Sequence, residues 1–316
     1  MSEANNVNET IIKPGIGLVL DGGGGKGAYQ VGVLKALKEN GLLDDVVAIS
    51  GSSIGAVNAM LFAMDDIDLM YKVWDDIDIL TIFDVDLEML IERRPYFSRD
   101  EMLKRIEKYI DFDKIKNGKY DIYSTICKIE TGLDEFSVEY RKLDDYPVDT
   151  IKQILLASTA LPIIYEAVEI DGGFYRDGGI CDNEPIKPLY DAGIRQFIVI
   201  GLNSAKKFDG SKWPDANFIT IYPSHNLGDL IDGTLNFSQK SIKFREMLGE
   251  KDGIRSIKTK FMPDDMYIRL EGALAQNDYN EINMQIRAEG AYKAMETKVN
   301  SNIEKFEALA KKYENY

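Results

Sequence analysis

Residues 46–55 read VVAISGSSIG, a short apolar run followed by a serine turn between two glycines. The run predicts a buried strand, and the apolar stretch 56–63 predicts a helix. A Gly-x-Ser-x-Gly turn between a strand and a helix lifts its serine above the edge of a sheet. The N–H groups and the dipole at the helix N-terminus favour negative charge there. We therefore predict that Ser53 is a nucleophile.

The alternation of strands and helices continues on both sides of this turn, which predicts an α/β fold with a parallel sheet. Asp171-Gly172-Gly173 predicts the turn of a hairpin between 167–170 and 174–176. Hydrophobic periodicity predicts the remaining elements. These are strands over 16–20, 120–129, 135–140, 197–202 and 218–222, and helices over 28–37 and 150–157.

The chain is strongly acidic. Its 38 basic and 53 acidic residues give a formal net charge of -15. This balance argues against nucleic acid as a partner, because neutralising phosphates needs clustered Lys and Arg. It also disfavours electrostatic binding to an anionic membrane. Peripheral contact with a neutral lipid surface stays open, since apolar side chains can drive it.

The two cysteines, Cys127 and Cys181, are too few for a disulfide framework. Both lie in apolar or strand-like surroundings, so we expect inert buried thiols. The polar residues 1–10 do not resemble a signal peptide, and no apolar run approaches the ~18 residues of a membrane span. We expect a cytoplasmic protein. His and Cys do not cluster at ligand spacing, so no metal or other cofactor is expected.

A glycine-rich loop, residues 21–27 with the sequence DGGGGKG, lies between the first strand and the first helix. Gly22, Gly24 and Gly27 fit a dinucleotide fingerprint, but the second strand does not end in the acidic residue that would hold a ribose. A phosphate-binding P-loop needs Ser or Thr after its lysine, but here Lys26 is followed by Gly27. The other interpretation is an oxyanion hole beside Ser53. It is favoured because the glycine loop and the turn of Ser53 follow two strands that are expected to be neighbours. A nucleotide-binding protein remains the alternative function.

Two kinds of base could activate Ser53. The first is the single histidine, His225, which follows a predicted strand. The second is a carboxylate, and Asp177 in the turn Asp177-Gly178-Gly179 can be aimed by the loop after a strand. Asp171 is its rival, although it belongs to the predicted hairpin turn. An aspartate with a pKa of ~3.9 is a weak base unless the site is partly dry.

Four blocks of this chain, in this order, resemble the patatin-like phospholipase family. They are residues 18–27 with 32–34, residues 51–56, residues 157–162, and Asp177-Gly178-Gly179 with Asn183 and Pro185. The resemblance covers residues 16 to about 200. It implies a three-layer α/β/α sandwich with a mostly parallel central sheet. It also implies a Ser–Asp dyad that works without a catalytic histidine.

Carried over by position, the resemblance makes Ser53 the nucleophile and Asp177 the base. The amides of Gly22, Gly23 and Gly24, with Gly25, would form the oxyanion hole. Lys26 takes the family's basic position after the glycines, with a structural or charge-balancing role. The implied function is a serine acyl hydrolase acting on lipid or lysolipid esters, of the phospholipase A or lysophospholipase kind. A patatin fold used only as a binding scaffold is a further alternative.

We expect one main body with additions. Residues 1–14 form a flexible tail, and residues 15–230 form the catalytic domain. Residues 65–118, rich in Asp, Glu, Met and Leu, are a helical insertion or a lid. Residues 231–316 are a helical region packed on the same body. Its apolar positions from 279 onward fall on one helical face. They are Ile282, Ile286, Tyr292, Met295, Val299, Ile303, Phe306, Leu309 and Tyr313.

Overall fold

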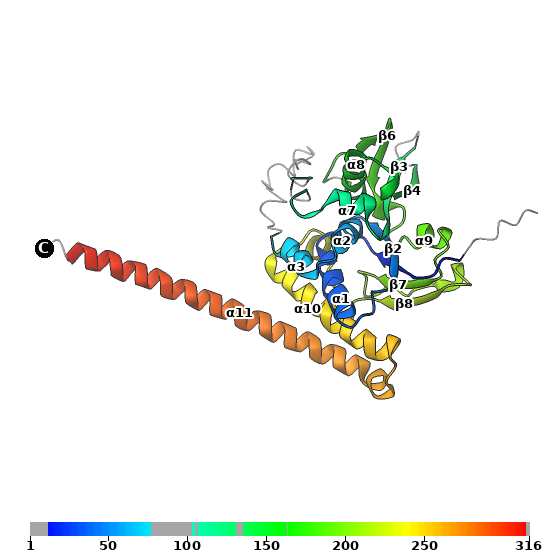
Figure 1. The fold of residues 1–316 in the computed structure, drawn as a ribbon. Helices are drawn as coiled ribbons and strands as arrows, with labels where there is room; N and C mark the ends of the chain where they lie inside the picture. Colours follow the sequence, from blue (N-terminus) through cyan, green and yellow to red (C-terminus); the bar gives the residue numbers. More distant parts are fainter. Residues whose placement is uncertain (1–11, 77–102, 105–106, 131–134, 163, 314–316) are drawn as a thin grey trace, which may run out of the picture.

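The computed structural model describes residues 12–76, 103–104, 107–130, 135–162 and 164–313. Within them, eight strands form one sheet in the order β5-β6-β3-β2-β1-β7-β8, with β4 paired to β3 (Figure 1). The strands are β1 (Ile16–Leu20), β2 (Val46–Ser52), β3 (Asp121–Ile129), β4 (Phe136–Lys142), β5 (Val168–Ile170), β6 (Gly173–Asp177), β7 (Gln196–Ile200) and β8 (Asn217–Ile221).

The sheet has a parallel part and an antiparallel part. Strands β3, β2, β1, β7 and β8 run parallel to one another, whereas β4, β5 and β6 add antiparallel pairings beyond β2. The predicted hairpin is the β5–β6 pair, and its turn places Asp171 and Gly172 at φ 51° and 78°. Such positive values are typical of hairpin turns. The predicted α/β fold with a mostly parallel central sheet is confirmed.

Helices and single turns connect these strands. The α-helices are α1 (Ala28–Glu39), α2 (Ile54–Phe62), α3 (Ile67–Asp76), α7 (Phe112–Asn117), α8 (Val148–Ser158), α9 (Lys187–Asp191), α10 (Gln239–Ser256) and α11 (Asp265–Tyr313). The 3-10 turns are η1 (Gly24–Gly27), η2 (Leu143–Asp145), η3 (Gly178–Ile180) and η4 (Gly210–Lys212). The π-helical turns are η5 (Leu230–Thr234) and η6 (Ile257–Phe261).

Alternating side chains of the strands serve two separate cores. Leu18 and Leu20 point into the larger core, which α1, α2, α8 and α10 cover. Val19 between them points to the opposite face, where Leu189 of α9 and aromatic residues of the segment after β7 complete a smaller core. The predicted three-layer sandwich is therefore confirmed, and one outer layer is much thinner than the other (Figure 1).

The C-terminal helices share the larger core. Helix α10 lies closely along α1, because a Cβ at Gly32 would come within 2.0 Å of the Glu246 carbonyl oxygen. In α11 the side chains of Ile282 and Ile286 are buried, as predicted. Beyond them the prediction of a packed face is wrong, because Tyr292 and Met295 are 70% and 67% exposed and the helix leaves the body (Figure 1).

The expectation of two separate thiols is also wrong, because Cys127 and Cys181 form a disulfide. Cys127 lies on β3 opposite Arg176 of β6, and η3 turns the chain back so that Cys181 reaches it. The two residues are 54 positions apart, and local sequence patterns carry no information about that pairing.

The expected N-terminal tail and the expected helical insertion or lid remain predictions. Residues 1–11, most of the expected tail, and residues 77–102, most of the expected lid, lie outside the described parts of the chain. Helices α3 and α7 bracket the second of these segments. None of the helices in the described parts combines the length and the apolar character needed to cross a bilayer.

Candidate active site

The pairing of β3 brings Ser53 and Asp177 together. Ser52, at the end of β2, pairs with Thr125, while Asp177, at the end of β6, pairs with the next residue of β3, Ile126. Strand β4 occupies the other edge of β3 over residues 123–129. Strands β2 and β6 therefore meet end to end along one edge of β3, and the turns that follow them share one place.

The backbone of Ser53 adopts an unusual conformation, with φ 53° and ψ -123°. Such a conformation persists only where the surroundings enforce it, and it is a feature of strand-to-helix serine turns. The flanking glycines allow the tight packing of this turn. A Cβ at Gly51 would lie 2.3 Å from the carbonyl carbon of Gly55, and a Cβ at Gly55 would lie 2.2 Å from the Leu20 carbonyl oxygen. The amide of Ser53 donates to the Ser158 hydroxyl at 3.0 Å.

Ser53 and Asp177 form a direct hydrogen bond. The Ser53 hydroxyl donates to Asp177 Oδ2 at 2.6 Å, and the other carboxylate oxygen accepts from the Gly179 amide at 2.8 Å. Asp177 is only 4% exposed. Burial raises the pKa of this carboxyl group to about 6, although the two hydrogen bonds oppose the shift. Its basicity is therefore closer to what proton transfer near neutral pH requires.

The glycine loop lies beside Ser53. A Cβ at Gly22 would be 3.1 Å from Ser53 Cβ, and Gly24 has φ +54°. The Gly22 amide donates to the Asn183 carbonyl at 3.2 Å, so it is already engaged. The amides of Gly23 and Gly24 donate to no acceptor within the parts of the chain that the structure describes. Gly25 is buried inside η1.

Asn183 connects the glycine loop with the turn after Asp177. Its side-chain amide donates to the Gly22 carbonyl at 3.0 Å, and its own carbonyl accepts from the Gly22 amide. Because a trans peptide directs its C=O and N–H to opposite sides, this bond to the Gly22 carbonyl also fixes the direction of the Gly23 N–H. The sequence pattern contained Asn183 but gave it no role.

A buried polar network supports the glycine loop from below, and sequence reasoning missed it. Asn58 donates to the Gly27 carbonyl at 3.0 Å and to the side chain of Gln30 at 2.8 Å, and it accepts from the Trp74 indole at 3.1 Å. Gln30 in turn donates to the Asp21 carbonyl at 2.9 Å. The available signal was one polar residue among apolar neighbours in each helix, Gln30 in the first half of α1 and Asn58 in α2.

The rival bases lie elsewhere. The His225 ring stacks on Tyr279 of α11 with centroids 4.1 Å apart, and its Nδ1 contacts the Ser224 hydroxyl at 3.1 Å. Asp171 occupies the exposed β5–β6 turn. Lys26 is part of η1, and its pKa is lowered by burial and by the neighbouring Arg245. Of the candidates considered, Asp177 is the one bonded to Ser53.

Comparison with known proteins places this geometry in context. The model of the patatin-like phospholipase family matches residues 18–190. An uncharacterized NTE family protein of Mycobacterium tuberculosis is 29% identical over 200 residues, which cover 61% of this chain and 50% of that protein. Lysophospholipase NTE1 of Cryptococcus neoformans is 28% identical over 201 residues, covering 60% of this chain and 11% of that protein.

The chain thus spans half or less of the length of these relatives. Among solved structures, VipD from Legionella pneumophila matches with a TM-score of 0.47 and 14% identity, covering 87% of this chain and 74% of that chain. Human GIVD cytosolic phospholipase A2 matches with a TM-score of 0.46 and 10% identity, covering 87% and 61%.

Proposed function

The chain belongs to the patatin-like phospholipase family, and on that premise we propose that it is a serine lipid acyl hydrolase. Its substrates would be carboxylic esters of phospholipids or lysophospholipids. The observation that carries the proposal is the 2.6 Å hydrogen bond from Ser53 to the buried Asp177. Beside it lie the amides of Gly23 and Gly24, which have no acceptor among the residues that the structure describes. Relatives named lysophospholipases support the substrate class.

The acylation step follows from this arrangement. Ser53 Oγ attacks the ester carbonyl carbon while Asp177 Oδ2 accepts the hydroxyl proton over the existing hydrogen bond. Negative charge develops on the carbonyl oxygen, and the amides of Gly23 and Gly24 would donate to it. The tetrahedral intermediate then collapses. The bond to the alcohol breaks, Asp177 returns the proton to that alcohol, and an acyl ester remains on Ser53.

Deacylation repeats the same steps with water. Asp177 takes a proton from a water molecule as the water oxygen attacks the acyl carbon. Collapse of the second intermediate releases the fatty acid and returns the proton to Ser53. Burial helps Asp177 in both halves of the reaction, because a carboxylate with a raised pKa binds the transferred proton more tightly. No histidine takes part in these proposed reaction steps.

The test is labelling with a fluorophosphonate, followed by mass-spectrometric mapping of the modified residue. We expect modification of Ser53 and no modification of the Ser53→Ala variant. A panel of phospholipid, lysophospholipid and soluble monomeric esters then gives the substrate class. An unlabelled Ser53, together with tight binding of NAD or ATP in calorimetry, would replace this proposal with nucleotide binding.

A further inference from the structure

Two aliphatic side chains face the solvent in the turn that contacts the glycine loop. Leu230 and Ile231 begin η5 and are 58% and 73% exposed. Single exposed apolar residues are ordinary on protein surfaces. Here two are consecutive in the chain, and they lie in a turn that borders the glycine loop.

The turn η5 is packed directly against the glycine loop. A Cβ at Gly24 would lie 2.1 Å from the Thr234 carbonyl oxygen, and a Cβ at Gly233 would lie 2.3 Å from Lys26 Cε. The backbone of η5 thus touches the loop whose amides lie beside Ser53. Leu230 and Ile231 belong to the same five-residue turn, so their exposed side chains, called the rim below, lie within one helical turn of this contact.

The turn is held from inside by a buried arginine. Arg245 of α10 donates to the carbonyls of Leu227, Asp232 and Asn236, at 3.2, 2.8 and 2.5 Å. Burial lowers the pKa of its guanidinium group to about 10. Three carbonyls on both sides of the aliphatic pair are therefore satisfied internally. The aliphatic pair is displayed on a fixed support.

The exposed charges that flank this pair in the chain are negative, whereas Lys26 and Arg245, which also adjoin the turn, are half-buried and buried. Asp229 and Asp232 are exposed on either side of the pair, and Asp229 also caps the turn by accepting from the Ile231 and Asp232 amides at 2.9 and 3.2 Å. Together with the net charge of -15, these carboxylates oppose approach to an anionic surface. Apolar contact with a zwitterionic surface is not opposed in this way.

We propose that Leu230 and Ile231 dock the protein on a zwitterionic lipid surface, such as one of phosphatidylcholine. This proposal rests on the proposed lipid hydrolase function, because an enzyme that cleaves lipid esters must contact the lipid surface that contains them. Insertion of the two side chains would bring ester groups of the surface to the entrance of the Ser53 site. The glycine loop that borders η5 would then receive a substrate that has not crossed bulk water.

The experiment compares vesicle binding with catalysis. Binding to phosphatidylcholine vesicles is measured by sedimentation with the full chain carrying Ser53→Ala, so that no lipid is consumed. The Leu230→Asp/Ile231→Asp double substitution is expected to lower the partition coefficient about tenfold or more. The neutral Leu230→Ser/Ile231→Ser pair should lose binding in the same direction. With Ser53 present, both pairs should retain turnover of a soluble monomeric ester within about twofold.

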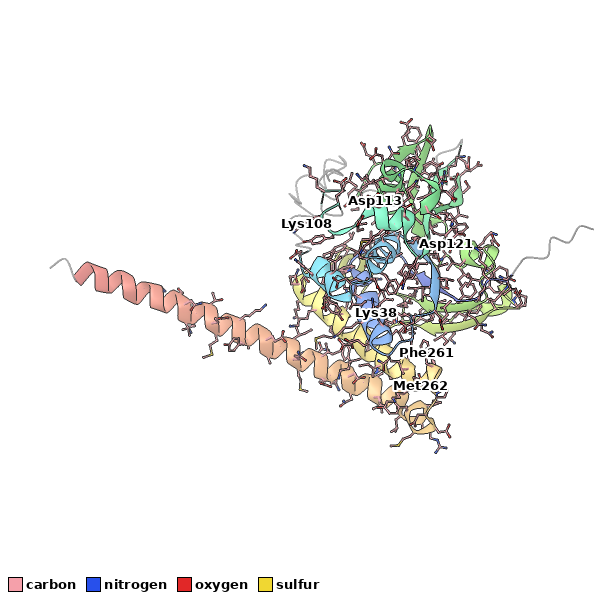
Figure 2. The ribbon with its side chains drawn as sticks, in the orientation of Figure 1. Lys38, Lys108, Asp113, Asp121, Phe261 and Met262 are labelled. Carbon is pink, nitrogen blue, oxygen red and sulfur yellow. A yellow bond between two sulfur atoms is a disulfide. The ribbon has the colours of Figure 1, made fainter. Side chains whose placement is uncertain are left out.

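Met262 provides the matched control. It is 54% exposed at the connection between α10 and α11 (Figure 2), and α10 extends about 27 Å from its start near η5 to that connection. Met262→Asp should leave vesicle binding unchanged. Adding phosphatidylglycerol to the vesicles should weaken the binding of the unsubstituted rim.

Three results would overturn the docking proposal. They are unchanged vesicle binding by both double variants, an equal loss with Met262→Asp, and stronger binding to phosphatidylglycerol vesicles. Failure of the hydrolase proposal looks different. The chain with Ser53 intact would then neither react with a fluorophosphonate nor cleave the monomeric ester, whatever its vesicle binding.

Discussion

Asp177 combines near-complete burial with a hydrogen bond to a strained serine, and each partner can be changed alone. Ser53→Ala removes the nucleophile and should abolish esterase activity. Asp177→Asn removes the base and should lower kcat by roughly 10²–10⁴. His225→Ala should retain most activity, because its ring stacks on Tyr279. Initial rates on a soluble ester would check this, and a near-normal rate for Asp177→Asn would refute the dyad.

The pH dependence of the reaction should report Asp177. Because its pKa is raised to about 6, the carboxyl group is protonated and inactive as a base below that pH. We expect kcat/KM to rise with pH through about 6 and then level off. An ordinary aspartate would place this limb near ~4. A pH–rate profile of the monomeric ester distinguishes the two values.

The same pKa shift has a stability consequence with a defined sign. The folded state binds this proton more tightly than the unfolded state does, so stability falls as pH rises from ~4 to ~6. Above that window Asp177 reduces the free energy of unfolding by about 3 kcal/mol. Asp177→Asn should therefore gain stability at pH 7 relative to the natural chain, and the gain should shrink toward pH 4. Urea unfolding at both pH values would measure it.

Asn183 should influence turnover through the direction of the Gly23 amide. Replacing it by Ala removes the bond to the Gly22 carbonyl, and we expect kcat to fall about tenfold or more with little change in KM. A purely structural role would instead lower the unfolding midpoint and leave kcat per labelled enzyme unchanged. Fluorophosphonate titration of active sites separates these outcomes.

At the scale of single residues, the sequence predicted which residues belong to the candidate site better than it predicted how they are arranged. The spacing around Ser53 follows from sterics, because residues 51 and 55 leave no room for a side chain. The turn after Asp177 likewise needs Gly178, whose Cβ would lie 2.2 Å from the Thr125 carbonyl oxygen. The engaged Gly22 amide and the Asn58 network depend on contacts between distant segments, and no local pattern encodes them.

Among elements, strand β3 organises the site, since it pairs with β2, β4 and β6. Apolar runs predicted where most strands lie, and the Asp171-Gly172-Gly173 turn predicted the β5–β6 hairpin. They could not predict that β2 and β6 meet on one edge, because strand pairing depends on global topology. The π-helical turn η5 had no sequence signature either.

The disulfide belongs to this scale as well, because it ties Cys181, the residue after η3, to β3 next to Asp177. Closing a loop across 54 residues restricts the unfolded chain, by roughly 4 kcal/mol in the chain-entropy account. We expect a reducing agent to lower the urea midpoint of the natural chain. The Cys127→Ser/Cys181→Ser double variant should start lower and not respond to the reductant. A natural chain equally stable with and without reductant would contradict this expectation.

For the whole molecule, the sequence predicted the layered body well and the C-terminal region poorly. Alternating strand residues and helical periodicity report burial directly, which explains the success for the sheet and for Ile282 and Ile286. The same periodicity continues through Tyr292 and Met295, which are exposed. Periodicity shows that a face is apolar, and it says nothing about whether the fold reaches far enough to cover it.

The extension of helix α11 beyond the body affects how the molecule diffuses in water. Helix α11 has 49 residues, so at a rise of about 1.5 Å per residue it is about 74 Å long. A compact chain of 316 residues would have a radius of gyration of about 20 Å. The protruding rod therefore raises friction, makes rotational diffusion anisotropic, and gives the molecule a larger Stokes radius than its 35.7 kDa mass implies.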